Sequence, residues 1–280
     1  MKIKITSDST CDLAQDILEK YDIDLVPLIV IKGDREYLDG ITITPDDIFS
    51  HVAAGGNLCT TAARNAAVYH DMFAKYAEDY DGIIHINIGA NFSSSYQNAC
   101  MAAMDFDNVR VIDSMNLSTG QGHIVLKAVE LSQTATSLDE LKAELDAYAQ
   151  RVESSFVLDR LDYMVKGGRC SAAAALGANL LNLKPCIEVK DGKMSVVKKY
   201  RGHFDKCLAS YIKDRLENRN DLDYSRIFLT YTVLPESIIS EVRGEINTLG
   251  SFETMYECQA GCTISCHCGP GTLGILLVRK

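Results

Sequence analysis

Hydrophobic residues in the first half of the chain form short continuous runs, separated by longer stretches in which they recur at helical spacing. The runs predict strands at 24–31, 82–88 and 109–113, and the alternating residues 2–6 predict a further strand. The stretches predict helices at 12–21, from Thr44-Pro45 onward, and at 65–79, 94–104, 118–133 and 137–153. Apolar strands joined by helices are typical of a parallel sheet covered on both faces. We therefore expect an N-terminal, Rossmann-like α/β domain with a mainly parallel sheet.

The pattern changes near residue 154. Strand-like segments now outnumber helices, and Asp191-Gly192 is typical of a hairpin turn. The predicted strands are 155–158, 185–189, 194–200, 227–232, 253–257 and 273–278, and the predicted helices are 204–219 and 235–247. This predicts a C-terminal α+β domain with a mixed or antiparallel sheet. We expect two domains, 1–154 and 155–280, with a ligand site in the cleft between them.

Composition narrows the function. The 280 residues suit two domains, and the formal net charge of −10 without any basic run argues against nucleic acid as a partner. No stretch approaches the roughly 18–20 apolar residues of a transmembrane segment, so any membrane contact should be transient. The N-terminal residues also lack the apolar core of a signal peptide, so we expect a cytoplasmic protein.

Four of the ten cysteines lie close together near the C-terminus, around His267: Cys258, Cys262, Cys266 and Cys268. Their spacing does not match the paired ligands of common zinc sites. In a continuing strand, Cys266 and Cys268 would face one side and His267 the other. We therefore expect reduced, buried thiols and neither a metal nor another cofactor.

Residues 267–274, His-Cys-Gly-Pro-Gly-Thr-Leu-Gly, contain the spacing G-x-G-x-x-G. A dinucleotide site needs a helix after this motif, but here an apolar, strand-like run follows. Pro270 also removes an N–H from the turn. The segment therefore favours a pocket residue at His267, with a purely structural histidine as the alternative.

Two further segments accompany this turn: Lys166-Gly-Gly-Arg169 and the opening Thr6-Ser-Asp-Ser-Thr10. In order and spacing the chain resembles the DegV family of bacterial lipid-binding proteins over its whole length. The resemblance implies one long-chain fatty acid bound in an interior apolar tunnel, with its carboxylate at the domain interface. It also implies that a separate fatty acid kinase makes the acyl-phosphate, so that this chain is not itself an enzyme.

The resemblance also implies site residues. Thr61 and Ser93 match two family hydroxyls that contact the carboxylate, and His267 matches a histidine close to them. Arg169 would be a cation near the head group, or a structural arginine bound to carbonyls. Arg201 falls where the family has a basic residue that docks the kinase.

The loop at 61–65 departs from the family sequence, since Ala62, Ala63, Arg64 and Asn65 replace Ser-Gln-Pro-Ser. Arg64 or Asn65 would then share the binding of the carboxylate. From the residues alone, this loop and the one around Ser93 also fit plain helix N-caps.

A serine hydrolase acting on a lipid ester is the alternative from another class. Ser93, His267 and Asp113 would form its triad, although the nucleophile elbow G-x-S-x-G is missing. A fluorophosphonate would label Ser93 in a hydrolase and not in a carrier.

Overall fold

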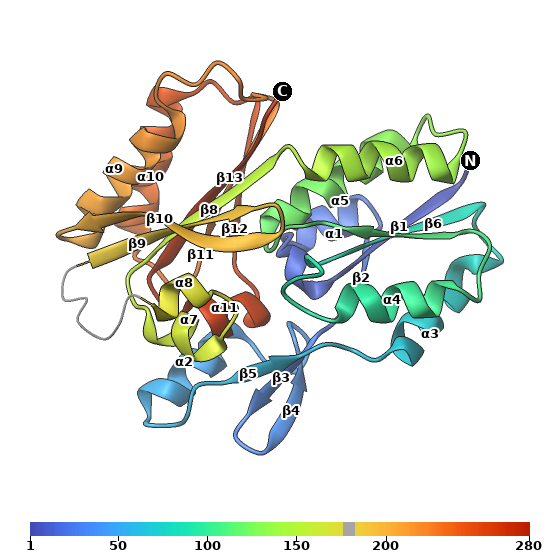
Figure 1. Cartoon of the computed structure of the whole chain (residues 1–280), viewed down its shortest axis with the longest axis horizontal. Coiled ribbons are helices and arrows are strands. Elements are labelled where there is room, and N and C mark those ends of the chain that lie inside the picture. The colour runs from blue at the N-terminus through green and yellow to red at the C-terminus, as the bar shows by residue number, and fades with distance from the viewer. Residues whose placement is uncertain (176–182) are drawn as a thin grey trace.

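The computed structural model describes residues 1–175 and 183–280. Two large sheets lie side by side, and a small three-stranded sheet lies below them in Figure 1. One large sheet has four strands and the other has six. The predicted fold class, a parallel α/β half followed by an α+β half with a mixed sheet, is confirmed.

The four-stranded sheet is parallel throughout, with the order β2-β1-β6-β7. Its strands are β1 (Ile3–Asp8), β2 (Asp24–Val26), β6 (Gly82–Asn87) and β7 (Val109–Asp113). The accompanying helices are η1 (Ser9–Cys11), α1 (Gln15–Lys20), α3 (Ala66–Ala77), α4 (Ser95–Ala103), α5 (Thr119–Ser132) and α6 (Leu138–Ala149). Helices α3 and α4 cover one face of the sheet, and α5 and α6 cover the other (Figure 1).

The three-stranded sheet is antiparallel, with the order β4-β3-β5. It consists of β3 (Ile29–Lys32), β4 (Arg35–Leu38) and β5 (Thr60–Ala62), and α2 (Pro45–Ala53) precedes β5. The prediction of one strand over 24–31 is wrong: β2 ends at Val26, and β3 begins in a different sheet after Pro27, which lacks an N–H. Because β5 pairs with β3, Thr61 lies opposite Val30.

The six-stranded sheet has the order β10-β9-β8-β13-β11-β12, and only β11 and β12 pair in parallel among its described strands. The strands are β8 (Val152–Leu158), β9 (Leu183–Lys190), β10 (Lys193–Arg201), β11 (Arg226–Tyr231), β12 (Thr254–Gln259) and β13 (Thr272–Val278). The helices are α7 (Asp162–Gly167), α8 (Ser171–Ala174), α9 (Phe204–Leu216), α10 (Glu236–Leu249) and α11 (Cys262–Cys268). Asp191 and Gly192 have φ of 50° and 69°, as the predicted hairpin turn requires.

Helix α5 connects the two large sheets, and ten of its 14 residues are buried. Gln121 Nε2 donates to Asp8 Oδ1 in the parallel sheet at 2.9 Å. From the same helix, His123 Nε2 donates to the carbonyl of Leu276 in the six-stranded sheet at 2.9 Å. One apolar core cluster therefore contains residues of both halves. Residue 154 lies within β8, and the division into domains 1–154 and 155–280 stays a prediction.

The first helix is shorter than predicted. Ser9–Cys11 form a 3₁₀ turn that ends at Asp12 in the left-handed region, with φ of 50°, so α1 begins only at Gln15. Among the described residues, no helix is both long enough and apolar enough to span a bilayer.

Candidate functional site

Helix α11 carries His267 in its last turn, and two aspartates from the first half of the chain cap its first turn. Asp39 Oδ1 and Oδ2 accept hydrogen bonds from the main-chain N–H groups of Cys262 and Thr263, at 2.9 and 3.1 Å. Asp12 Oδ1 accepts from Gly261 N at 2.9 Å. Carboxylates at a helix N-terminus satisfy its free N–H groups and favour its dipole.

The expectation that Cys266, His267 and Cys268 continue a strand is therefore wrong. Strand β13 begins only at Thr272, and the residues before it form a helix. The acidic caps come from positions more than 200 residues away in the chain, so no local sequence signal marks the start of this helix.

The Gly-Pro-Gly turn after α11 packs against the segment that precedes α7 and against α7 itself. Gly269 and Gly271 have φ of 73° and 74°, a region that favours glycine. A Cβ on Gly269 would lie 2.6 Å from the ring of Tyr163, and a Cβ on Gly271 would lie 2.7 Å from Cβ of Asp159. The glycines thus allow the close approach that brings α7 next to His267.

His267 and Thr61 lie 206 positions apart in the sequence and are hydrogen-bonded, with 2.8 Å between Nε2 and Oγ1. Strand β5 supplies Thr61, and α11 supplies the imidazole. The other ring nitrogen, Nδ1, is buried without a hydrogen-bond partner among the described residues. It faces Gly167, where an added Cβ would lie only 2.3 Å away.

Burial, and secondarily the positive charge of Arg169, lowers the pKa of His267 to about 4. The imidazole is therefore neutral at pH 7 and carries one proton. In the tautomer with that proton on Nε2, the ring donates to Thr61 Oγ1. The hydroxyl proton of Thr61 is then free to be donated to a third group, and a carboxylate oxygen is a suitable acceptor.

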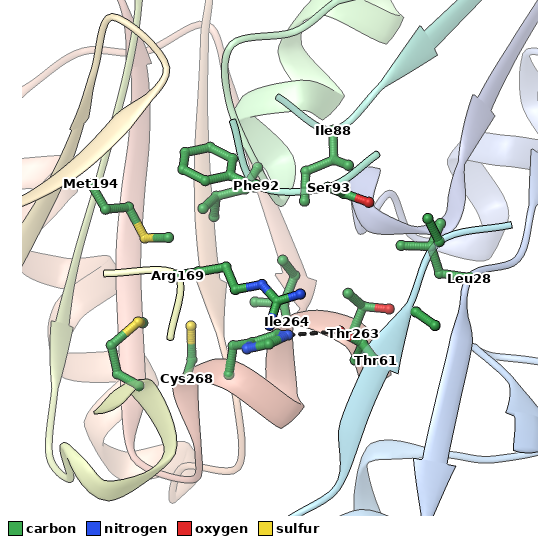
Figure 2. Close-up of a pocket in the computed structure, with 15 residues that line it drawn as sticks. Leu28, Thr61, Ile88, Phe92, Ser93, Arg169, Met194, Thr263, Ile264 and Cys268 are labelled. Carbon is green, nitrogen blue, oxygen red and sulfur yellow. Dashed lines mark hydrogen bonds between the residues drawn. The ribbon is translucent and has the colours of Figure 1, made fainter. Parts of the chain in front are cut away.

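Thr61, Ser93, Arg169 and His267 line one cavity of about 50 Å³, called here the His267 pocket (Figure 2). Apolar side chains form most of its remaining wall: Leu28, Ala62, Ala63, Ile88, Phe92, Leu117, Met164, Met194 and Ile264, together with Cys268 and Thr263. Figure 2 shows Thr61, Ser93 and Arg169 coming from three separate segments, with apolar side chains such as Met194, Phe92 and Leu28 around them.

Two of these polar residues also make local structural contacts. Ser93 Oγ accepts from Ser95 N at 3.2 Å, just before α4, although the N-cap residue of this helix is Ser94 and its side chain makes no capping hydrogen bond. Arg169 Nη1 donates to the carbonyl of Gly167 at 2.8 Å, as expected of a structural arginine after a glycine turn. Each side chain therefore combines a local contact with a place in the pocket wall.

A second cavity of about 30 Å³, the inner cavity, shares Leu117, Ile264 and Cys268 with the His267 pocket. Its wall includes Ser and Thr residues, but their hydroxyls are already paired within the protein. The pairs are Ser118 with Asp12, Ser155 with Tyr211, Thr230 with Thr119, Thr232 with Thr272 N, and Thr272 Oγ1 with Cys268 O. The inner cavity is therefore apolar in character despite its Ser and Thr residues.

Three other residues singled out from the sequence lie outside the described pocket wall. Asn65 Oδ1 accepts from Val68 N at 3.2 Å and caps α3. Arg64 contributes its main-chain carbonyl to Asn98 Nδ2 at 2.7 Å. Arg201 is exposed at the end of β10. The structure thus brings Thr61, Ser93, Arg169 and His267 together, and it does not bring Asn65 or Arg201 to them.

The triad of a hydrolase is not assembled among the described residues. His267 Nε2 is bonded to Thr61. Asp113 Oδ1 accepts from the main-chain N–H groups of Ala90 and Met115, at 3.0 and 2.8 Å. Within residues 1–175 and 183–280, no cluster of three or more His, Cys, Asp or Glu side chains is arranged to hold a metal ion.

The wall of the His267 pocket comes from both the α/β half and the α+β half, and such a position is typical of small-ligand sites. The chain matches the family model described as "Uncharacterised protein, DegV family" over residues 2–280, and it belongs to the DegV family.

A DegV domain-containing protein from Clostridium acetobutylicum is 33% identical, over 100% of this chain and 99% of the relative. A solved DegV family protein from Thermus thermophilus, described by its fatty acid binding, has 29% identity and a TM-score of 0.88, with 100% of both chains covered. A stearic-acid-binding protein from Eubacterium ventriosum has 26% identity and a TM-score of 0.82, over 99% of this chain and 98% of that one.

Proposed function

We propose that this protein binds one long-chain fatty acid, with the carboxylate in the His267 pocket and the tail directed through the inner cavity. The observation that carries the proposal is the Thr61–His267 hydrogen bond of 2.8 Å at one side of an apolar wall. The fatty acid binding described for the Thermus thermophilus and Eubacterium ventriosum proteins supports it.

The polar groups suit a carboxylate. Thr61 and Ser93 offer hydroxyl donors, and Arg169 adds positive charge. A buried carboxylate without such donors is strongly disfavoured. Because His267 is neutral at pH 7, it orients Thr61 and does not add a second full charge.

The tail supplies most of the affinity. Each buried methylene contributes about 0.8 kcal/mol, so a dozen contribute roughly 10 kcal/mol before the cost of ordering the chain. An acyl chain of that length needs more room than the two cavities of about 50 and 30 Å³ offer. The side chains that separate the cavities, Leu117 and Ile264, would turn aside to join them.

The first experiment is mass spectrometry of a solvent extract of the purified protein, which should contain about one fatty acid per chain. Binding of added fatty acid is then measured for Thr61→Ala and Ser93→Ala, each expected to lose about 1–3 kcal/mol. Thr60→Ala and Ser94→Ala are matched controls, since these neighbours are exposed. A folded protein that neither carries nor binds any fatty acid would refute the proposal.

The chain further acts as a carrier that presents its fatty acid to a separate fatty acid kinase, with Arg201 on the docking surface. The family resemblance and the exposure of Arg201 at the end of β10 support this step. Arg201→Glu should reduce acyl-phosphate formation by the kinase and leave fatty acid affinity unchanged. Lys190→Glu, at the other end of the hairpin, is the control for charge alone.

A further inference from the structure

Three cysteines form a compact group beside the three-stranded sheet: Cys59, Cys262 and Cys266. They are buried, and they pack with Val30, Ile43 and Ile48 in one apolar cluster. Cys262 and Cys266 lie one turn apart on the same face of α11. Cys59 comes from the segment just before β5, and all ten cysteines are free thiols.

Two of the three sulfurs form a pair. Cys59 and Cys266 lie in the same cluster, and each is the largest cause of the other's shifted pKa. The third thiol has another partner, because Cys262 Sγ donates to the carbonyl of Ile43 at 3.2 Å. Within the cluster, the contact of Cys262 with Ile43 and the mutual effect of the other two thiols favour Cys59 and Cys266 as the pair that reacts.

This pair joins the same two segments as the Thr61–His267 hydrogen bond. Cys59 precedes Thr61 by two residues, and Cys266 is adjacent to His267. Strand β5 packs directly against α11. The described walls of the His267 pocket and the inner cavity contain neither sulfur, so a bond between them would leave the ligand space free.

We propose that Cys59 and Cys266 are an oxidation site, at which a hydroperoxide forms a disulfide that holds β5 against α11 and slows fatty acid exchange. The effect on exchange rests on the proposed function, whereas formation of the disulfide does not. One thiolate attacks the peroxide oxygen to form a sulfenic acid, and water or an alcohol leaves. The second thiol then attacks that sulfur and releases water. Two thiols lose two electrons and two protons, and the hydroperoxide is reduced.

Cys59 is the favoured first nucleophile. The hydrogen bond from Cys266 lowers the pKa of Cys59, against the opposing effect of burial, and Lys32 lowers it further. The same contact raises the pKa of Cys266. A thiol with a lowered pKa is more often present as the reactive thiolate. Cys59 also follows the exposed residues Gly55 and Asn57, so opening of this loop would admit a small oxidant.

A competing bond between Cys262 and Cys266 would have a different consequence. Both residues belong to α11, so a bond between them would place no constraint on β5. Peptide mapping distinguishes the two products, and only the product that contains Cys59 should change ligand exchange.

The experiment treats purified full-length protein with hydrogen peroxide and maps disulfides by mass spectrometry without reduction. Release of a fluorescent fatty acid is followed before and after oxidation, in wild type, Cys59→Ser and the matched control Cys262→Ser. After oxidation, wild type and Cys262→Ser should contain the Cys59–Cys266 disulfide and should release the ligand more slowly by about tenfold or more. Dithiothreitol should restore the original release rate of both proteins. Their melting temperature should rise by about 5 °C on oxidation.

Cys59→Ser should show no such slowing. If this variant fails to fold, Cys266→Ala is the second variant in which the slowing should be lost. Absence of the Cys59–Cys266 peptide after oxidation overturns the inference, and so does a bonded protein with an unchanged release rate. If the reduced wild type binds no fatty acid, the proposed function fails, while peptide mapping and melting still decide whether the disulfide forms.

Discussion

Replacement of Gly167 by alanine is a test of the geometry around His267, because it adds one methyl group at a known place. The new Cβ would lie 2.3 Å from Nδ1 and 3.3 Å from Cε1 and Cγ of the imidazole. Ordinary Cβ contacts begin near 3.4 Å and almost none lie below 3.0 Å, so the ring and Gly167 must separate by about 1 Å. The ring belongs to a buried side chain, and Thr61 lies at its Nε2.

Because Nδ1 and Nε2 lie on opposite sides of the ring, a displacement of about 1 Å away from Gly167 would push Nε2 into Thr61 Oγ1, which is already at 2.8 Å, so the ring must turn aside and the hydrogen bond is lost. Loss of such a bond costs about 0.5–1.5 kcal/mol, and the hydroxyl of Thr61 also loses its orientation toward the carboxylate. We therefore expect Gly167→Ala to weaken fatty acid binding by about tenfold. Displacement of a fluorescent fatty acid measures the affinity, and thermal melting measures the stability in parallel.

Gly168 provides the matched control. It has φ of 69°, and an added Cβ would meet nothing within 4 Å. Asparagine is tolerated in this left-handed region, so Gly168→Asn should leave both affinity and stability close to wild type. Wild-type affinity in folded Gly167→Ala would refute the argument that the place of His267 determines binding. Equal losses in both variants would assign the effect to the loop as a whole.

Three further predictions concern stability and ligand selection. The free energy of unfolding should fall as the pH drops from 6.5 toward about 4, since only the unfolded chain then binds a proton at His267. Thermal melts of His267→Gln should show a smaller loss of stability over this pH range, and the buried His85 and His123, whose pKa values are also lowered, account for the loss that remains. Asp39→Ala should cost about 2–4 kcal/mol in urea unfolding, because buried N–H groups of α11 lose their acceptors. Ile264→Ala should join the two cavities and favour longer over shorter acyl chains in competition binding, at a cost of about 2–5 kcal/mol in stability.

The sequence predicts correctly those helices and strands that are determined by residues within or next to the element itself. Strand β7 lies at the predicted 109–113, and α2 begins at Pro45 after Thr44, whose side chain forms a capping box with that of Asp47. Strand β6 is buried along its whole length and lies inside the parallel sheet, between β1 and β7. In these segments the hydrophobic spacing and the turn residues lie within a few positions of each other.

The parts of the site that sequence reasoning missed depend on distant partners. Strand β5 exists because it pairs with β3, and α11 is capped by Asp12 and Asp39. Gly167 belongs to a segment that resembles the family, but its contact with His267 exists only in the folded chain. The resemblance suggested Thr61, Ser93, Arg169 and His267, and the structure adds the hydrogen bond and the contacts that relate them. Their roles in binding a carboxylate stay predictions.

The position of β13 has a consequence for the synthesis of this protein. It is the last strand along the chain, yet it lies between β8 and β11 in the middle of the six-stranded sheet. Without it, that sheet consists of two separate pieces, β10-β9-β8 and β11-β12. The parallel sheet is complete by Asp113, so it can form while translation continues, whereas the second sheet must wait until residues 272–278 leave the ribosome. The α/β half can therefore fold before the wall of the inner cavity is complete. In a nascent chain stalled on the ribosome before Thr272, the first half should resist protease, whereas the second half should be unfolded and cleaved.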